Sequence, residues 1–200
     1  MKEDILKKAT EMFLTLGFKS VTMDDIAAEM GISKKTIYQH FSNKNDLVEA
    51  STMHVFETIS TGIDCICNLN KNAIDEIFEI RSFMMRQLNN EKSSPFYQLQ
   101  KYFPRVFTCL RKKQYDKMQD CVKNNLSKGI ASGLYRSDID VDFIARIYFV
   151  GVTGIKDLDI FPENLYSVYD LTEKFLDYHL RAIVSPDGLK LLDKLIQKKP

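Results

Sequence analysis

The chain has 200 residues, of which 44% are hydrophobic, enough for one medium domain or for a small domain fused to a larger one. Lys and Arg number 28 against 27 for Asp and Glu, so the net charge of +1 carries no information about nucleic acid and any basic surface must be local. The N-terminus lacks the apolar core of a signal peptide, and no run reaches the length of a membrane helix. We therefore expect a globular cytoplasmic protein with no membrane partner.

The first two helices are marked by their ends. Apolar residues recur at helical spacing up to Leu16, and Gly17 stands where a left-handed C-terminal cap is expected. Thr22 followed three residues later by Asp25 predicts a capping box at the start of a second helix. A second stop falls at Gly31.

The third and fourth helices follow directly. Ser33 is the predicted N-cap of a short helix from Lys34 to Phe41, and Ser42 or Asn43 caps a much longer one. Together these signals predict a compact three-helix unit over residues 1–46.

The remaining residues, 47–200, keep the helical pattern and show no alternation of period two. Asp140, Asn164 and the Ser185-Pro186 pair are predicted helix starts, and Gly133 is a predicted stop. We therefore predict an all-α protein of nine or ten helices, with the small N-terminal unit followed by a larger helical body.

The third helix has two unlike faces. At about 100° per residue, Ile37 and Phe41 share one face, and Gln39 lies nearly opposite with Lys35 beside it. A helix that ends at a glycine, a tight turn and a short helix with a polar ridge make a helix-turn-helix, whose second helix enters the major groove of DNA. The alternative is a helical hairpin with a solvated face.

The stretch TMDDIAAEMGISKKTIYQHFSNKNDLVEA resembles the DNA-binding signature of TetR-family transcriptional repressors. The matching positions are Thr22, Ile26, Ala27, Gly31, Ile32, Ser33, Ile37, Tyr38, His40, Phe41, Lys44 and Leu47. The resemblance covers about the first quarter of the chain, and Lys35 departs from it because that position is often glycine.

The resemblance implies a double-stranded DNA operator as partner and a contact role for ten residues. Tyr38, His40 and Lys44 would hold backbone phosphates, and Gln39 would read a base edge as the best candidate. The full set is Thr22, Met23, Ser33, Lys34, Lys35, Thr36, Tyr38, Gln39, His40 and Lys44, with Thr22 or Met23 acting through the backbone. Ile37 and Phe41 would be core.

A helix-turn-helix reader usually works as a dimer, since one half-site offers too little contact for specificity. Two segments, 142–155 and 164–184, have broad apolar faces, and the resemblance implies that such penultimate helices pair with those of a second copy. The candidate interface residues are Ile147, Gly151, Gly154, Val168, Phe175 and Leu176. Packing within one chain is the alternative for each.

The middle of the chain is rich in Phe, Tyr, Met and Cys, which can line a cavity for an apolar or amphipathic ligand. The candidate pocket residues are Phe56, Phe83, Met84, Tyr102, Phe103, Phe107, Met118 and Cys121. From the residues alone, plain core is the better reading of each, and only the resemblance implies a pocket and an unidentified small-molecule effector. A body that binds a protein partner is the alternative.

Chemistry beyond binding is not indicated. The four cysteines, Cys65, Cys67, Cys109 and Cys121, are expected to be reduced thiols, and the spacing of the first two is poor for metal ligands. The three histidines are scattered, so a helical enzyme or ligand carrier is an unlikely alternative. We expect no catalytic residue, no metal and no cofactor.

Overall fold

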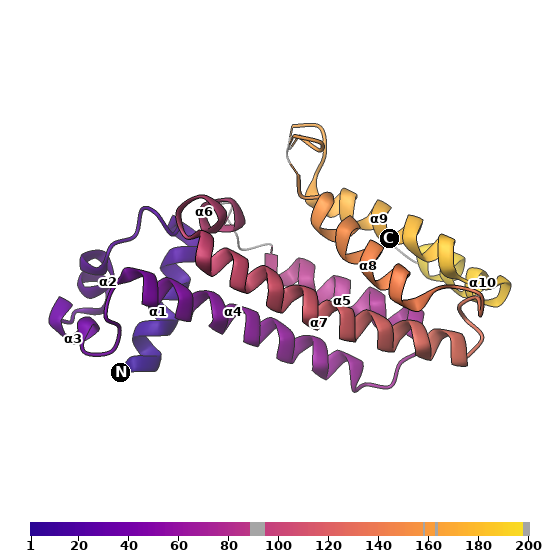
Figure 1. Ribbon diagram of the computed structural model, residues 1–200, viewed down its shortest axis with the longest axis horizontal. Helices are drawn as coiled ribbons and strands as arrows, with labels where there is room; N and C mark the ends of the chain where they lie inside the picture. The colour runs from indigo at the N-terminus through magenta and orange to yellow at the C-terminus, as the bar shows by residue number, and fades with distance from the viewer. Residues whose placement is uncertain (89–94, 158, 163, 198–200) are drawn as a thin grey trace. The chain divides into compact units, whose positions relative to one another are not determined.

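The computed structural model describes residues 1–88, 95–157, 159–162 and 164–197. These residues form α-helices and no β-strand (Figure 1). The helices are α1 (Lys2–Leu16), α2 (Met23–Met30), α3 (Lys34–Tyr38), α4 (Lys44–Cys67), α5 (Ala73–Leu88), α6 (Pro95–Tyr102), α7 (Pro104–Ala131), α8 (Val141–Gly154), α9 (Val168–Ile183) and α10 (Pro186–Gln197). The all-α prediction is confirmed.

The chain divides into two compact units. Unit 1 consists of residues 1–64 and 86–114, and unit 2 consists of residues 65–85 and 115–200. The boundary that we predict at residue 46 separates two functions and stays a prediction.

Unit 1 has a core that joins α1, α2 and α3 to the first turns of α4 (Figure 1). Ile5, Phe13, Ile26, Ile37 and Leu47 are completely buried in it. Side chains of α6 and the first part of α7 complete the same core. The short helix α3 is thus held by packing, because five residues are too few for a helix to persist alone.

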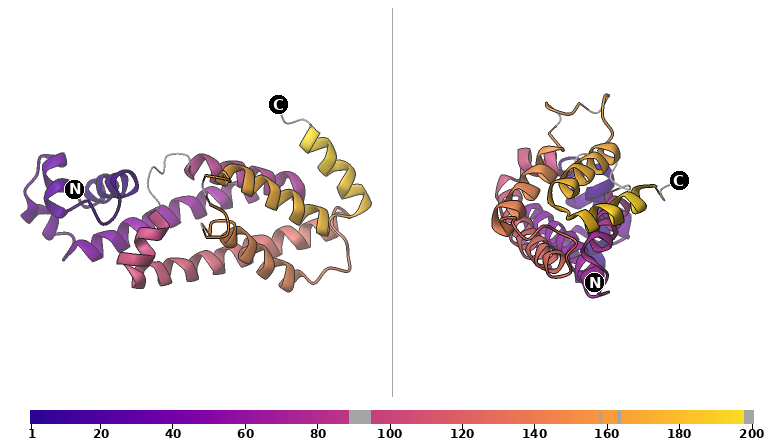
Figure 2. Two further views of the ribbon diagram at one scale, coloured as in Figure 1. Left: turned by 90° about the horizontal axis from the view of Figure 1, so that it is seen from above. Right: turned by 90° about the vertical axis from the view of Figure 1, so that its right-hand side faces the viewer.

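Unit 2 contains α8 and α9, which lie side by side (Figure 2), and the C-terminal helix α10. Leu126, Leu176, Leu180 and Leu192 lie in its core. Tyr135 is 2% exposed and follows the stop at Gly133, so the chain after α7 turns back into the core of its own unit.

A buried polar network ties α5 to α7 within unit 2. Asn125 Nδ2 donates to Glu76 Oε1 at 2.7 Å and to the Ala73 carbonyl oxygen at 2.9 Å. The Tyr135 hydroxyl donates to Asn125 Oδ1 at 3.0 Å, and Lys128 Nζ donates to Glu76 Oε2 at 2.7 Å. The buried carboxylate is therefore paired and hydrogen-bonded, as its desolvation requires.

Most predicted helix ends agree with the structure, including the capping box of Thr22 with Asp25. Asn43 caps α4, since its Oδ1 accepts from the Asp46 N–H at 3.0 Å. Asp140 and Ser185 cap α8 and α10 through their side-chain oxygens.

One predicted cap conformation and two predicted helix ends are wrong. Gly17 has φ 93° and ψ 145°, a positive φ in an extended rather than a left-handed helical conformation. Helix α3 ends at Tyr38 instead of Phe41, because the His40 N–H bonds three residues back to Ile37 and tightens the last turn. Helix α9 begins after Ser167 instead of at Asn164, because Ser167 Oγ accepts from the Asp170 N–H at 3.0 Å.

Among the described residues, no helix combines the length and the apolar character needed to cross a membrane.

Candidate nucleic-acid interface

The turn between α2 and α3 is built by local caps on both sides. Gly31 has φ 63° and ψ 30°, the left-handed conformation that residues with a side chain seldom adopt. The N–H of Ile32 donates back to the Ala27 carbonyl oxygen at 3.0 Å, and Ser33 Oγ accepts from the Thr36 N–H at 3.1 Å. These short-range bonds fix the direction of α3 against α2.

The segment from α3 to Phe41 separates a buried face from an exposed one. Ile37 is 0% exposed and Phe41 is 5% exposed, so both are core residues as predicted. Lys35, Tyr38 and Gln39 are exposed. A polar ridge formed by Lys35 and Gln39 is therefore held outward by two buried anchors, and we call it the α3 ridge.

The lysines of α3 differ in their partners. Lys34 Nζ lies 2.7 Å from Asp24 Oδ2 of α2 and 6.0 Å from the centre of the Tyr38 ring. The hydrogen bond to Asp24 raises the pKa of Lys34. Among the described residues, no carboxylate lies within salt-bridge distance of Lys35. Lys35 therefore supplies the less compensated positive charge of this helix.

The small polar residues of the motif bond to one another. The Ser33 and Thr36 hydroxyl oxygens are 2.8 Å apart, and the Thr22 hydroxyl donates to Asp25 Oδ2 at 2.8 Å. Met23 is 5% exposed, so only its backbone is open to a partner at the start of α2. Three residues of the predicted DNA-contact set, Thr22, Ser33 and Thr36, thus also form the hydrogen bonds that shape the helix starts.

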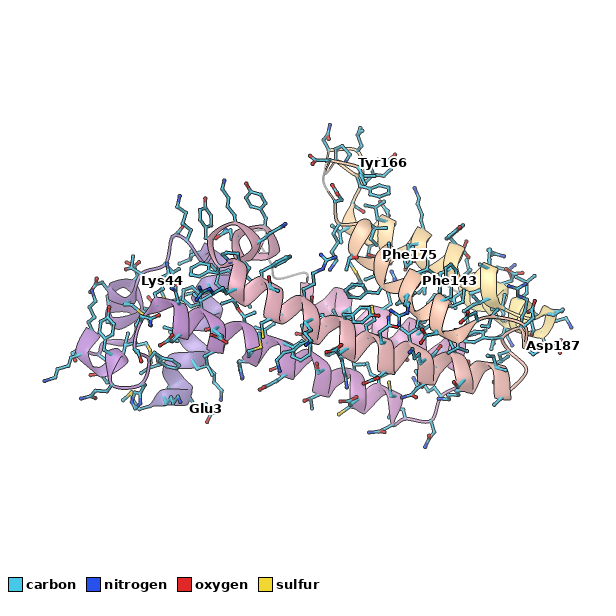
Figure 3. All side chains as sticks on the ribbon, in the orientation of Figure 1. Glu3, Lys44, Phe143, Tyr166, Phe175 and Asp187 are labelled. Carbon is cyan, nitrogen blue, oxygen red and sulfur yellow. The ribbon has the colours of Figure 1, made fainter. Side chains whose placement is uncertain are left out.

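Lys44 in the first turn of α4 has a structural contact (Figure 3). Its Nζ donates to the Lys19 carbonyl oxygen at 3.1 Å and lies 6.0 Å from the centre of the Phe103 ring. Burial lowers the pKa of the Lys44 ammonium, and the nearby Asp25 carboxylate opposes this shift. Lys44 thereby ties the loop after α1 to α4. His40 and Thr36 are also half-buried members of the predicted set, and His40 lies just after α3.

A second cationic surface was not anticipated from the sequence. Lys19 Nζ lies 4.8 Å and Lys101 Nζ 5.5 Å from the centre of the Tyr102 ring, and Lys101 Nζ donates to the Tyr97 hydroxyl at 3.1 Å. We call these four residues the lysine–tyrosine patch. The spacing of four between Tyr97 and Lys101 on α6 could have indicated that pair, whereas nothing local links it to Lys19.

The predicted pocket residues fall into both units. In unit 1, Phe56, Phe103 and Phe107 pack against the core, and Tyr102 is 38% exposed within the lysine–tyrosine patch. In unit 2, Met118 packs against the core and Cys121 touches Cys67. Phe83 and Met84 are half-buried on α5. A pocket lined by these residues stays a prediction.

The predicted interface residues on α8 and α9 also differ from one another. A Cβ on Gly151 would lie 2.1 Å from Phe175 Cε2, so this glycine admits the Phe175 ring between the two helices of one chain. Leu176 is 3% exposed and fills the core of unit 2, so we leave it out of the proposed dimer surface.

An apolar stripe remains uncovered on α8. Phe143 is 59% exposed (Figure 3), Ile147 45% and Val150 58%, and these residues recur at the three- and four-residue spacing of one helical face. Gly154 continues the spacing, and a Cβ there would meet no atom within 4 Å. We call these four residues the α8 stripe. Val168 at the start of α9 is 44% exposed.

The N-terminal part of the chain, which contains the helix-turn-helix, matches a known protein family. Residues 5–51 match the family model described as "Bacterial regulatory proteins, tetR family". Over 79 residues the chain is 30% identical to the "Biofilm operon icaADBC HTH-type negative transcriptional regulator IcaR" of Staphylococcus aureus, strain Newman; the match covers 40% of this chain. The chain spans only 42% of that relative's length.

Two further similarities extend over nearly the whole chain. The "HTH-type transcriptional repressor KstR2" of Mycolicibacterium smegmatis is 24% identical over 94% of this chain and 93% of its own. The crystal structure of a putative transcriptional regulator from Saccharomonospora viridis in complex with choline has a TM-score of 0.78 at 20% identity, covering 92% of this chain and 97% of that one. The fold is therefore shared along the chain, and its first quarter matches the helix-turn-helix of the tetR family of bacterial regulatory proteins.

Proposed function

We propose that the protein is a sequence-specific DNA-binding transcriptional repressor that a small apolar or amphipathic ligand releases from a palindromic operator. The observation that carries the proposal is the α3 ridge, in which exposed Lys35 on α3 and exposed Gln39 at its C-terminal cap are held outward by buried Ile37 and Phe41. A helix that served only the core would not need this unpaired polar edge. The names of two relatives, a negative regulator and a repressor, support the sign of regulation.

The side chains divide by the part of DNA that they contact. The Gln39 amide has one donor and one acceptor in the arrangement that pairs with adenine, and Lys35 reaches the acceptor atoms of guanine or a phosphate. Tyr38, His40 and Lys44 bind phosphates, with Lys44 using the N–H groups that its bond to Lys19 leaves open. The lysine–tyrosine patch adds cations beside Lys44 for the flanking backbone.

Residues 1–46 form the reading head in this proposal, and residues 47–200 form the body that dimerises and binds the ligand. The α8 stripe, with Val168, forms the contact between two copies, because three large apolar side chains on one face are otherwise left in water. A dimer also places two reading heads on the two halves of a palindrome. The protein acts in the cytoplasm, where the operator is.

The ligand-binding part of the proposal is supported by a neighbour of the same fold whose structure contains choline. The predicted pocket residues are the candidates for contact with an apolar effector. A body that binds a protein partner is the competing reading, and an effector that changes operator affinity would separate the two.

DNA recognition is tested with an operator enriched by the wild-type protein from a pool of random duplexes. Binding is then measured against salt concentration on this operator and on a scrambled duplex. Gln39→Ala should cost about 1–3 kcal/mol on the operator and leave the salt slope nearly unchanged, since it removes a base contact and no charge. Lys101→Ala should instead reduce the slope by about one unit on both duplexes.

Lys112→Ala is the matched control for the loss of one lysine, since Lys112 is exposed on α7 outside the predicted set. Equal loss of affinity by Gln39→Ala on both duplexes would show that Gln39 positions the protein and does not read sequence. Failure of the wild type to enrich any duplex would contradict DNA recognition itself.

Dimerisation is tested by sedimentation at micromolar concentration. The wild type should be a dimer, and Ile147→Glu should be a folded monomer because it places a charge in the α8 stripe without entering the core. Leu69→Glu, a similar change at a 59% exposed position of the same unit, should remain a dimer. A monomeric wild type would contradict the assignment.

A further inference from the structure

Two cysteines of unit 2 lie in contact although 54 positions separate them in the chain. Cys67 is the last residue of α4 and Cys121 lies within α7, and their Sγ atoms are 3.8 Å apart. Both side chains are only partly exposed, whereas Cys65 and Cys109 are exposed. The two contacting thiols are therefore a defined pair, distinct from the two surface thiols.

The backbone beside Cys67 allows the pair to close. A disulfide needs an S–S distance of about 2 Å, so the sulfur atoms must approach by somewhat less than 2 Å. Helix α4 ends at Cys67, and the following residues up to α5 are a turn that contains Asn70 with φ 52° and the exposed Leu69. A shift of the last residue of a helix disturbs fewer hydrogen bonds than a shift within it, so the movement falls on the Cys67 side.

We propose that Cys67 and Cys121 form a reversible intramolecular disulfide when the protein meets a hydroperoxide. The thiolate of Cys67 attacks one peroxide oxygen, an S–O bond forms, the O–O bond breaks, and the departing hydroxide takes up a proton. The Cys121 sulfur then attacks the Cys67 sulfur, the S–S bond forms and the S–O bond breaks. The second hydroxide leaves as water with the proton of Cys121. Two thiols and one hydrogen peroxide thus give one disulfide and two waters.

The order of these steps follows from the surroundings of the two sulfurs. Burial, followed by the nearby Cys67, raises the pKa of the Cys121 thiol to about 12, so Cys121 stays protonated and unreactive until a sulfenic acid is beside it. Within the pair, the first attack on the peroxide is therefore assigned to Cys67 at the end of α4. A dithiol reductant reverses the bond by thiol–disulfide exchange.

The disulfide would join the end of α4 to α7 within unit 2 and close a loop of more than fifty residues. Cross-linking a loop of this length removes conformations from the unfolded chain, so the oxidised protein should unfold at a temperature higher by roughly 5–15 °C. This inference does not depend on DNA binding, since it rests on one contact between two thiols.

The test treats the purified full-length protein with one equivalent of hydrogen peroxide, blocks free thiols with N-ethylmaleimide and maps tryptic peptides by mass spectrometry. Cys65 and Cys67 share the tryptic peptide 45–71, whereas Cys121 lies on 118–123, so the mapping uses Cys65→Ser to leave one thiol on the first peptide. We expect these two peptides to be linked, with loss of two hydrogens in mass, and to separate after dithiothreitol.

Cys67→Ser and Cys121→Ser should each lose both the linked peptide and the rise in unfolding temperature, while Cys109→Ser should keep them. Circular dichroism checks that every variant is folded before oxidation. Peroxide that links two chains through Cys65 or Cys109, or that leaves Cys121 free beside an oxidised Cys67, would overturn the proposal.

Discussion

Asn125 offers the sharpest test of the packing in unit 2. Its side chain is 4% exposed and bridges three groups: the Ala73 carbonyl, the Glu76 carboxylate and the Tyr135 hydroxyl. Asn125→Ala removes all three hydrogen bonds and puts no new polar group in their place. The Tyr135 hydroxyl then loses its acceptor inside the core, while Glu76 keeps Lys128.

The free-energy change follows from these contacts. Two hydrogen bonds between neutral groups contribute about 1 kcal/mol each, and the bond to the carboxylate contributes about 1.5–3 kcal/mol. The sum predicts that Asn125→Ala lowers the free energy of unfolding by about 4 kcal/mol. For a chain of 200 residues this corresponds to a decrease of roughly 8–16 °C in the unfolding temperature.

The assay is urea denaturation followed by circular dichroism at one fixed protein concentration, because the stability of a dimer depends on concentration. Asn124→Ala is the control, since the neighbouring Asn124 is exposed, and it should change the free energy by less than about 0.5 kcal/mol. Tyr135→Phe should fall between the two, because it removes one bond of the three. A loss below about 1 kcal/mol for Asn125→Ala would refute this account of the network.

Two further predictions concern α8 and α9. Gly151→Ala should destabilise the protein by about 1–3 kcal/mol, because its Cβ would overlap the Phe175 ring, whereas Gly154→Ala should not; equal thermal melts would contradict this. His179 is buried against the rings of Tyr148 and Phe175, and burial lowers its pKa to about 4 from 6.5. Between pH 6.5 and pH 4 the imidazole is therefore protonated in the unfolded chain but neutral in the folded chain. Stability should therefore fall as pH drops from 6.5 to 4, by about 3 kcal/mol more in the wild type than in His179→Gln by urea denaturation; parallel pH profiles would contradict it.

The parts of the fold that the sequence predicts correctly are those decided by neighbours in the chain. The capping box at Thr22, the left-handed Gly31 and the N-cap at Ser33 each depend on residues at most four positions away. The missed start of α9 belongs to the same class, since Ser167 and Asp170 have the spacing of a serine cap and its acidic partner. That signal is in the sequence, but the prediction of a helix start at Asn164 does not use it.

Other contacts could not be predicted from one sequence because they join distant segments. The bond of Lys44 to the Lys19 carbonyl and the contact of Cys67 with Cys121 both depend on which helices pack together. Apolar periodicity indicates that a residue such as Leu176 is buried, but it does not say whether its own chain or a second copy covers it. The structure answers this for Leu176, which its own unit buries, and leaves Ile147 exposed.

The distribution of charge explains how a nearly neutral chain can present a cationic edge. Asp24 balances Lys34, and the pairing also fastens α3 to α2. Lys44 uses one of its bonds to hold the loop after α1. Among the described residues, Lys35 has neither a salt bridge like that of Lys34 nor a backbone contact like that of Lys44, so its charge is open to a partner. Lys34 and Lys44 thus have structural contacts that Lys35 lacks among the described residues. Under the proposed DNA-binding role, Lys35→Ala should weaken operator binding while leaving the unfolding temperature unchanged, whereas Lys44→Ala should lower both.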